Sequence, residues 1–166
     1  MAWQDTVLPT LKAAGVRLFA YVPDKPLVPI IDALWADPEV ETVNATREEE
    51  ALAIASGAYL AGTRSCVMMQ VSGLGNCVNA LSSLNIPQTI PVLLLITERG
   101  GLGEFNCSQV PMGRAARPVL DALGIQSWYV EREEDVEPVL AGAVPLCMAT
   151  RQPVAVIFAQ RMTGGE

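Results

Sequence analysis

Short apolar runs alternate along the chain with longer segments whose apolar residues recur at helical spacing. The runs at Ser65–Val71 and Pro91–Thr97 are almost continuously apolar, which is typical of strands buried on both faces of a parallel sheet. Other strands are predicted at Arg17–Val22, Val40–Val43, Gln126–Val130 and Pro153–Phe158. Helices are predicted at Asp5–Ala14, Leu27–Trp35, Thr46–Leu60, Cys77–Leu84, Ala115–Leu123 and Glu133–Ala149.

This alternation of strands and helices predicts a three-layer α/β/α domain with a mainly parallel central sheet. No linker or internal repeat divides residues 1–166, so we expect a single domain, with residues 162–166 frayed. Ligands of open α/β sheets gather at the carboxyl ends of the strands. The segments that follow the predicted strands are therefore the first places to look for chemistry.

One such segment is Ser72–Asn76, Ser-Gly-Leu-Gly-Asn, which we predict as a turn between a strand and a helix. Its glycines allow positive φ and close approach of a ligand to the backbone. As a dinucleotide fingerprint it would use Gly73 and Gly75 as the first two glycines, with Glu98 as the ribose-binding acid, but Val78 occupies the third glycine position. A turn that needs glycine for its geometry alone explains the pattern equally well.

A second feature is the glutamate run at the start of the third predicted helix. Thr46 and Glu49 have the spacing of a capping box, and Gly62 is predicted to end the helix. Glu48 lies on the same side as the apolar residues of the helix, and this makes its carboxylate a candidate acid–base group. The simpler explanation is an acidic first turn favoured by the helix dipole.

Composition narrows the classes of function. The chain has no histidine, which excludes Ser-His-Asp and Cys-His nucleophile systems and histidine-ligated metals. Four widely spaced cysteines are expected to be reduced and mostly buried. A net charge of −7 without a basic cluster argues against nucleic-acid binding. The apolar runs are far shorter than the ~20 residues of a membrane span, and no signal peptide is visible, so we expect a cytoplasmic protein.

Three strings together identify a family. They are TREEEALAIASGAYLAG, VMMQVSGLGNCVNALSSL and IPVLLLITERGGLGE, the last followed by QVPMG. The chain resembles the pyrimidine-binding domain of thiamine-diphosphate-dependent 2-oxoacid decarboxylases over essentially its whole length. Within that family it is most similar to the alpha subunits of sulfopyruvate decarboxylase, with phosphonopyruvate decarboxylase as near kin.

The resemblance implies a role for Glu48. In the family, a glutamate stands three residues before an alanine and nine residues before a helix glycine, and Glu48, Ala51 and Gly57 have this spacing. That glutamate hydrogen-bonds N1′ of the cofactor's aminopyrimidine and so promotes activation of the thiazolium carbon. The family's G-D-G motif, which serves the diphosphate and Mg²⁺, does not occur here. The resemblance therefore implies a beta subunit that holds the diphosphate and Mg²⁺, no metal ligand in this chain, and an assembly of at least two alpha and two beta chains.

Further site residues follow from the family's pattern. Asp24 is expected to assist protonation of the intermediate, or else to be an ordinary turn residue before Lys-Pro. Lys25 and Arg99 are cations at strand ends that would neutralise a sulfonate or phosphonate, or would simply be solvated. The remaining candidates are Pro23, Ser72, Gly73, Leu74 and Asn76 for the cofactor, and Gln70, Asn79 and Gln109 for the substrate.

The implied reaction is decarboxylation of sulfopyruvate to sulfoacetaldehyde. Phosphonopyruvate is the alternative substrate, because the two oxoacids differ only in the anion of the tail. A different class of function also stays open at this point, namely a non-catalytic nucleotide-binding or regulatory module that uses the glycine-containing segment.

Overall fold

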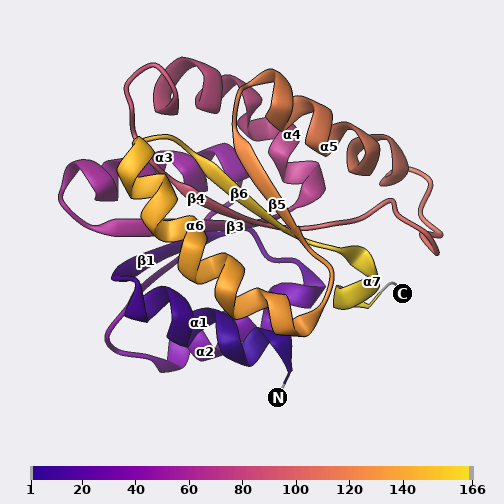
Figure 1. Ribbon diagram of the computed structural model, residues 1–166, viewed down its shortest axis with the longest axis horizontal. Coiled ribbons are helices and arrows are strands. Elements are labelled where there is room, and N and C mark those ends of the chain that lie inside the picture. The colour runs from indigo at the N-terminus through magenta and orange to yellow at the C-terminus, as the bar shows by residue number, and fades with distance from the viewer. Residues whose placement is uncertain (1, 165–166) are drawn as a thin grey trace.

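The computed structural model describes residues 2–164 as an open six-stranded sheet with helices on both faces (Figure 1). The strands are β1 (Val16–Tyr21), β2 (Glu41–Asn44), β3 (Arg64–Gln70), β4 (Leu93–Thr97), β5 (Gln126–Val130) and β6 (Val154–Phe158). The α-helices are α1 (Trp3–Ala13), α2 (Val28–Ala36), α3 (Glu48–Leu60), α4 (Val71–Ala80), α5 (Val110–Ala122), α6 (Val136–Thr150) and α7 (Gln160–Thr163). Short 3₁₀ turns precede α2 (η1, Lys25–Leu27) and α6 (η3, Glu133–Asp135), and a π-helical segment (η2, Leu81–Asn85) extends α4.

The strand order is β2-β1-β3-β4-β6-β5, and every pairing is parallel. From β1 the chain moves outward to β2 and then returns to the other side of β1 to form β3. The order therefore reverses between β1 and β3, and such a switch point is where open α/β sheets bind their ligands. The predicted fold class is confirmed.

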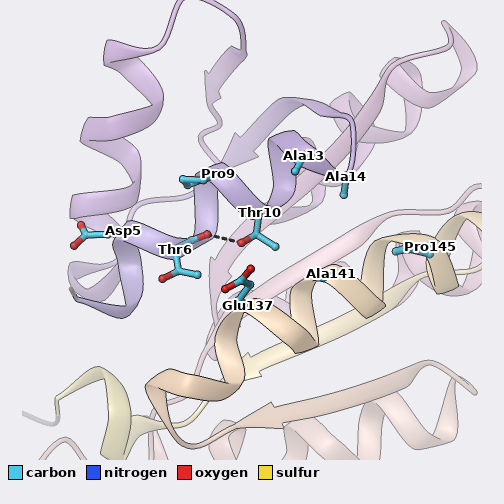
Figure 2. A pocket seen from close by; sticks show the side chains of 9 residues that line it. All are labelled: Asp5, Thr6, Pro9, Thr10, Ala13, Ala14, Glu137, Ala141 and Pro145. Carbon is cyan, nitrogen blue, oxygen red and sulfur yellow. Dashed lines mark hydrogen bonds between the residues drawn. The ribbon is translucent and has the colours of Figure 1, made fainter.

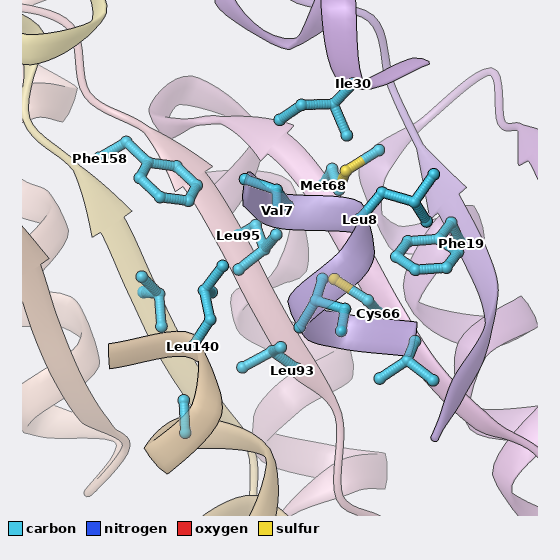
Figure 3. Packing of buried hydrophobic residues seen from close by; sticks show 14 of the residues in the cluster. Val7, Leu8, Phe19, Ile30, Cys66, Met68, Leu93, Leu95, Leu140 and Phe158 are labelled. Carbon is cyan, nitrogen blue, oxygen red and sulfur yellow. The ribbon is translucent and has the colours of Figure 1, made fainter. Parts of the chain in front are cut away.

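Two apolar cores lie on the two faces of the sheet. Helices α1, α2 and α6 cover one face, and α3, α4 and α5 cover the other (Figure 1). On the first face, side chains of α1 such as Val7 fill the space above the central strands, where Phe19, Leu95 and Phe158 are fully buried (Figure 3). Strands buried on both faces explain why the sequence shows apolar runs instead of alternation.

The prediction that Ser72–Asn76 forms a turn is wrong. Strand β3 ends at Gln70 and α4 begins at Val71, so the whole segment is helical, and neither of its glycines has a positive φ. Helical spacing already starts at Val71, which is buried together with Leu74 and Leu81 on one side of the helix. The dinucleotide interpretation depended on a glycine turn and loses its geometric basis.

The predicted capping box is also wrong. Helix α3 begins at Glu48 with Arg47 at the N-cap, one residue later than a Thr46 cap requires. Thr46 therefore bonds to Glu50 and not to Glu49. Glu50 Oε2 accepts hydrogen bonds from the hydroxyl of Thr46 at 2.6 Å and from the backbone N–H of Thr46 at 2.8 Å. Gly62 follows the helix with φ of 90°, as predicted for a stop signal.

At the C-terminal side, residues 160–163 form α7, so the part of the predicted frayed tail at Met162 and Thr163 is helical. The rest of that prediction lies largely outside the described residues. Cys66, Cys77 and Cys147 are buried free thiols and Cys107 is exposed, in line with the expectation of mostly buried cysteines. No helix between residues 2 and 164 has the length and apolar character needed to cross a membrane.

Candidate functional site at the strand ends

A hydrogen-bonded network joins the carboxyl ends of three adjacent strands. Asp24 follows β1, Gln70 ends β3 and Thr97 ends β4. Gln70 Nε2 donates to Asp24 Oδ1 at 3.0 Å, and Thr97 Oγ1 donates to Asp24 Oδ2 at 2.5 Å. Ser72 Oγ donates to Gln70 Oε1 at 2.6 Å, which extends the network to the first turn of α4. Both oxygens of the half-buried Asp24 carboxylate are therefore held in a defined orientation.

Glu48 lies beside the same turn of α4. It is the first residue of α3, is half-buried, and its Oε2 accepts a hydrogen bond from Asn76 Nδ2 at 2.8 Å. Its other oxygen, Oε1, accepts no hydrogen bond from residues 2–164. The neighbouring Glu49 is engaged differently, because its Oε1 pairs with Arg47 Nε at 2.6 Å. Glu49 Oε2 is buried and also has no hydrogen-bond partner in the described part of the chain, so a free oxygen alone does not distinguish the two glutamates. What distinguishes Glu48 is that a side chain of another helix, Asn76 of α4, fixes one of its oxygens.

Gly73 of α4 packs against the side chain of Glu48. A Cβ added to the buried Gly73 would lie 2.3 Å from Glu48 Cγ, so the glutamate side chain occupies the space that any larger residue would need. The expectation that this glycine admits a ligand to the backbone is therefore not supported at Gly73, where the close approach is made by Glu48.

The other residues predicted on β1, α4 and α5 are placed as follows. Pro23 is exposed beside Asp24, and Asn79 is exposed on α4 about one turn beyond Asn76. Leu74 is fully buried in the core beneath α4, so only its backbone can face a ligand. Gln109 is half-buried at the N-cap of α5, at the end of the β4–α5 loop.

Arg99 belongs to a second polar cluster, centred on Glu104. The nearly inaccessible Glu104 carboxylate accepts hydrogen bonds from the backbone N–H groups of Gly100 at 3.1 Å and Asn106 at 3.0 Å, and from Arg99 Nε at 3.2 Å. Gln160 of α7 donates to Glu104 at 3.1 Å and accepts from the N–H of Gly101 at 2.7 Å. The cluster ties the β4–α5 loop to the end of β6 and holds Arg99 in an ion pair, so Arg99 is not simply solvated.

These bonds lower the pKa of Glu104 from its ordinary 4.5 to about 2, chiefly through the two backbone N–H donors. Because the folded-state pKa is the lower one, Glu104 contributes stability above pH 4.5 that is lost as the pH falls toward 2. We expect Glu104→Gln to be less stable than the wild type at neutral pH, with a difference that shrinks at acid pH. Urea unfolding at pH 7, 5, 4 and 3 measures this, and a pH-independent difference would contradict it.

Lys25 and Arg99, predicted as cations for the substrate, line one hollow of about 340 Å³ near the strand ends. Gln4 and Pro26 also line it. The structure therefore brings together two positively charged residues that lie far apart in the sequence. It leaves open space beside them that a small anion can enter.

A larger groove of about 860 Å³ lies elsewhere, between α1 and α6 (Figure 2). In it, Thr6 and Thr10 of α1 face Glu137 and Ala141 of α6 (Figure 2). Its lining includes none of the residues predicted for the site. We place the site at the strand ends, because the networks around Asp24 and Glu48 are there and not in the groove.

Three residues of these networks were missed from the sequence. Thr97 is a polar residue at the end of the otherwise apolar β4, and that position was a usable signal. Glu104 and Gln160 had no comparable signal, since they meet only through the pairing of β4 with β6.

Similarity to known proteins identifies the family of this chain. The family described as thiamine pyrophosphate enzyme, N-terminal TPP binding domain, matches residues 1–101. The chain belongs to this family. Thiamine pyrophosphate is the same compound as thiamine diphosphate. The matched region contains Asp24, Gln70, Thr97 and the Glu48–Asn76 pair.

Individual relatives refine this assignment. The chain is 35% identical over 154 residues to sulfopyruvate decarboxylase subunit alpha of Methanothermobacter thermautotrophicus, and the match covers 93% of both chains. It is 41% identical over 112 residues to phosphonopyruvate decarboxylase of Streptomyces viridochromogenes, which covers 67% of this chain and 28% of that one. The 2-oxoglutarate:ferredoxin oxidoreductase of Magnetococcus marinus shares the fold, with a TM-score of 0.76 over 98% of this chain and 29% of the other, at 18% identity.

The residues present fit the pyrimidine end of the cofactor. The ring nitrogens of an aminopyrimidine accept hydrogen bonds, so a carboxyl group pairs with one of them through a proton carried by either partner. Glu48 Oε1 has no other hydrogen-bond partner in the described part of the chain. Asn76 restrains the opposite oxygen, and Ser72 and Asn76 expose polar groups on the same end of α4.

Proposed function

We propose that this chain is the pyrimidine-binding alpha subunit of a heteromeric thiamine-diphosphate-dependent decarboxylase that converts sulfopyruvate to sulfoacetaldehyde and CO₂. The observation that carries the proposal is the 35% identity, over 93% of both chains, to a protein named sulfopyruvate decarboxylase subunit alpha. The restrained Glu48 carboxylate, in the position that the family pattern requires, supports it.

In this proposal Glu48 binds N1′ of the cofactor through Oε1, while Asn76 keeps Oε2 in place. Pro23, Ser72, the backbone near Leu74 and Asn76 would surround the ring. When bound, thiamine diphosphate supplies the nucleophilic carbon and the electron sink for decarboxylation. Glu48 is half-buried, so the cofactor and a partner chain would complete the removal of water from its carboxylate.

Asp24 is proposed as the group that handles the proton that replaces CO₂. Gln70 and Thr97 fix its two oxygens, so the carboxyl group has one orientation toward the space above the strand ends. The hydroxyl of Thr97 can donate to the ionised form or accept from the protonated form at Oδ2, so the contact survives either protonation state. A carboxyl group held in this way is suited to general acid–base work.

The substrate would be held by its two anionic ends. Lys25 and Arg99 line the same hollow and would neutralise the sulfonate, while Gln70, Asn79 and Gln109 would donate or accept hydrogen bonds near the keto acid. Phosphonopyruvate is the second candidate substrate, favoured by the 41% identity to a phosphonopyruvate decarboxylase. Its tail carries more negative charge, which the two cations would also attract.

The diphosphate and Mg²⁺ are proposed to lie on a beta subunit, because this chain lacks the G-D-G motif. The name "subunit alpha" of the Methanothermobacter relative supports a partner chain. The match covers only 28% of the Streptomyces relative, which supports the idea that further sequence is needed for a complete enzyme. We propose a cytoplasmic assembly of at least two alpha and two beta chains.

Reconstitution tests the proposal. The chain is co-expressed with the product of a neighbouring gene that encodes G-D-G, supplied with thiamine diphosphate and Mg²⁺, and CO₂ release from sulfopyruvate and phosphonopyruvate is measured. We expect turnover only with both chains and a higher kcat/KM for sulfopyruvate. A higher value for phosphonopyruvate would reassign the substrate. Nucleotide binding by the chain, with no decarboxylation of either acid, would reject the enzyme class.

A further inference from the structure

Helix α3 meets helix α4 where Glu48 packs against Gly73. This contact explains why position 73 is a glycine, although its backbone conformation would allow other residues. Gly73 is the third residue of α4 and is buried, and its φ is not positive. Glycine is a poor helix former, so a glycine in the first turn of a helix without a special φ calls for another reason. That reason is the neighbouring side chain.

The missing Cβ of Gly73 leaves the space that Glu48 fills. An added Cβ would lie 2.3 Å from Glu48 Cγ and 2.6 Å from both Cδ and Oε1, whereas real Cβ atoms stay at least 3.0 Å from such neighbours. Because the nearest atom is Cγ and not the tip of the side chain, a small tilt of the carboxylate would not relieve the clash. The whole Glu48 side chain would have to leave its rotamer.

Asn76 acts on the same side chain from one turn further along α4. Its Nδ2 donates to Glu48 Oε2 at 2.8 Å, and it is exposed, so it does not serve the core. A hydrogen bond to an ionised acceptor is stronger than one between neutral groups. Gly73 thus limits where the Glu48 side chain can go, and Asn76 limits how its carboxylate turns.

We propose that Gly73 and Asn76 are positioning residues that hold Glu48 in the orientation needed at the cofactor. The inference rests on the proposed function, since it assumes that Glu48 binds the aminopyrimidine. It changes the assignment of Gly73 from a residue that contacts the ring to one that acts through Glu48. Positioning errors near 1 Å can lower rates about 100-fold, so the effect is measurable.

Gly73→Ala is the main test, with Gly142→Ala as the matched control. Both replace glycine by alanine inside a helix, but a Cβ at Gly142 of α6 meets no atom within 4 Å. Because alanine favours helix more than glycine does, Gly142→Ala should melt at or above the wild-type temperature, whereas in Gly73→Ala the displacement of Glu48 offsets this gain. We expect kcat/KM of the reconstituted enzyme to fall about 100-fold in Gly73→Ala and to stay at the wild-type value in Gly142→Ala.

A measurement on the full chain without cofactor tests the contact itself. In the wild-type background, Glu48→Gln should shift the NMR resonances of the Asn76 side-chain amide, because the two groups are bonded. In the Gly73→Ala background, the same replacement should leave the Asn76 amide unmoved, since Glu48 has already been displaced. In the Gly142→Ala background, the shift should persist.

Asn76→Ala tests the proposal without adding an atom, at an exposed position where folding is not at risk. Loss of its bond to a charged group is expected to lower kcat/KM about 10-fold. Wild-type kcat/KM and an intact Glu48–Asn76 response in Gly73→Ala would overturn the inference, whatever Glu48→Gln does. A different outcome would separate the two proposals. If Glu48→Gln no longer shifts the Asn76 amide in the Gly73→Ala background, but Glu48→Gln alone is fully active, the positioning of Glu48 is supported and the proposed function is rejected.

Discussion

Glu48→Gln is expected to lower kcat/KM of the reconstituted enzyme by about 10²–10⁴-fold, the range typical of a lost acid–base group. If the amide oxygen keeps the hydrogen bond from Asn76, the amide nitrogen takes the place of Oε1. The ring nitrogen N1′ accepts hydrogen bonds and becomes protonated in the imino form of the cofactor, and an amide can neither give this proton nor take it back. CO₂ release from sulfopyruvate measures the loss, and the melting temperature should stay close to that of the wild type because Glu48 is half-buried.

Glu50→Gln is the matched control for this variant. Glu50 lies two residues away on the same helix, is exposed, and bonds to Thr46 instead of Asn76. It should retain wild-type kcat/KM, so a loss confined to Glu48 would reflect the site and not the acidity of the helix start. Equal losses in both variants, or full activity of Glu48→Gln, would contradict the assigned role.

Phe158→Ala is expected to produce the largest loss of stability, about 3–5 kcal/mol in the free energy of unfolding. Phe158 is fully buried at the end of β6, and its ring contacts that of Trp3 with centroids 4.6 Å apart. Truncation would leave a cavity between α1 and the sheet, in the core shown in Figure 3. Urea unfolding followed by circular dichroism gives the free energy and its denaturant dependence.

Phe105→Ala provides the comparison, because it removes the same ring from a position that is 71% exposed. A surface substitution of this kind should change the free energy of unfolding by less than about 0.5 kcal/mol. Similar losses for the two phenylalanines would show that the core under α1 is less tightly packed than the structure indicates.

The layers of the fold were predictable because buried parallel strands leave a strong trace, a short apolar run without alternation. Strand β5 has the bounds that the sequence predicts. The segment after β3 was predicted wrongly because glycine was taken as a sign of a turn. The apolar spacing from Val71 through Leu74 was the better signal, but it begins directly at the end of the strand, with no polar residues between.

For the candidate site, the sequence predicts single residues but not their contacts. The family pattern leads to Glu48 and Asp24, yet the partners that orient them come from elsewhere in the chain. Gly73 meets Glu48 only because α3 and α4 pack side by side, and Thr97 meets Asp24 only because β3 lies between their strands. Such contacts depend on helix packing and rotamers, which local sequence patterns do not encode.

The place of β6 in the sheet also imposes an order of events on folding. β6 lies between β4 and β5, and β5 pairs with no strand except β6 among the described residues. β5 therefore cannot join the sheet until a strand synthesised after it has already docked. Until then, the edge of β4 stays open, and open edges of this kind recruit other chains. We expect the chain to aggregate most readily during expression at the stage before β6 docks. Co-expression of a chaperone or a lower expression temperature should reduce this aggregation.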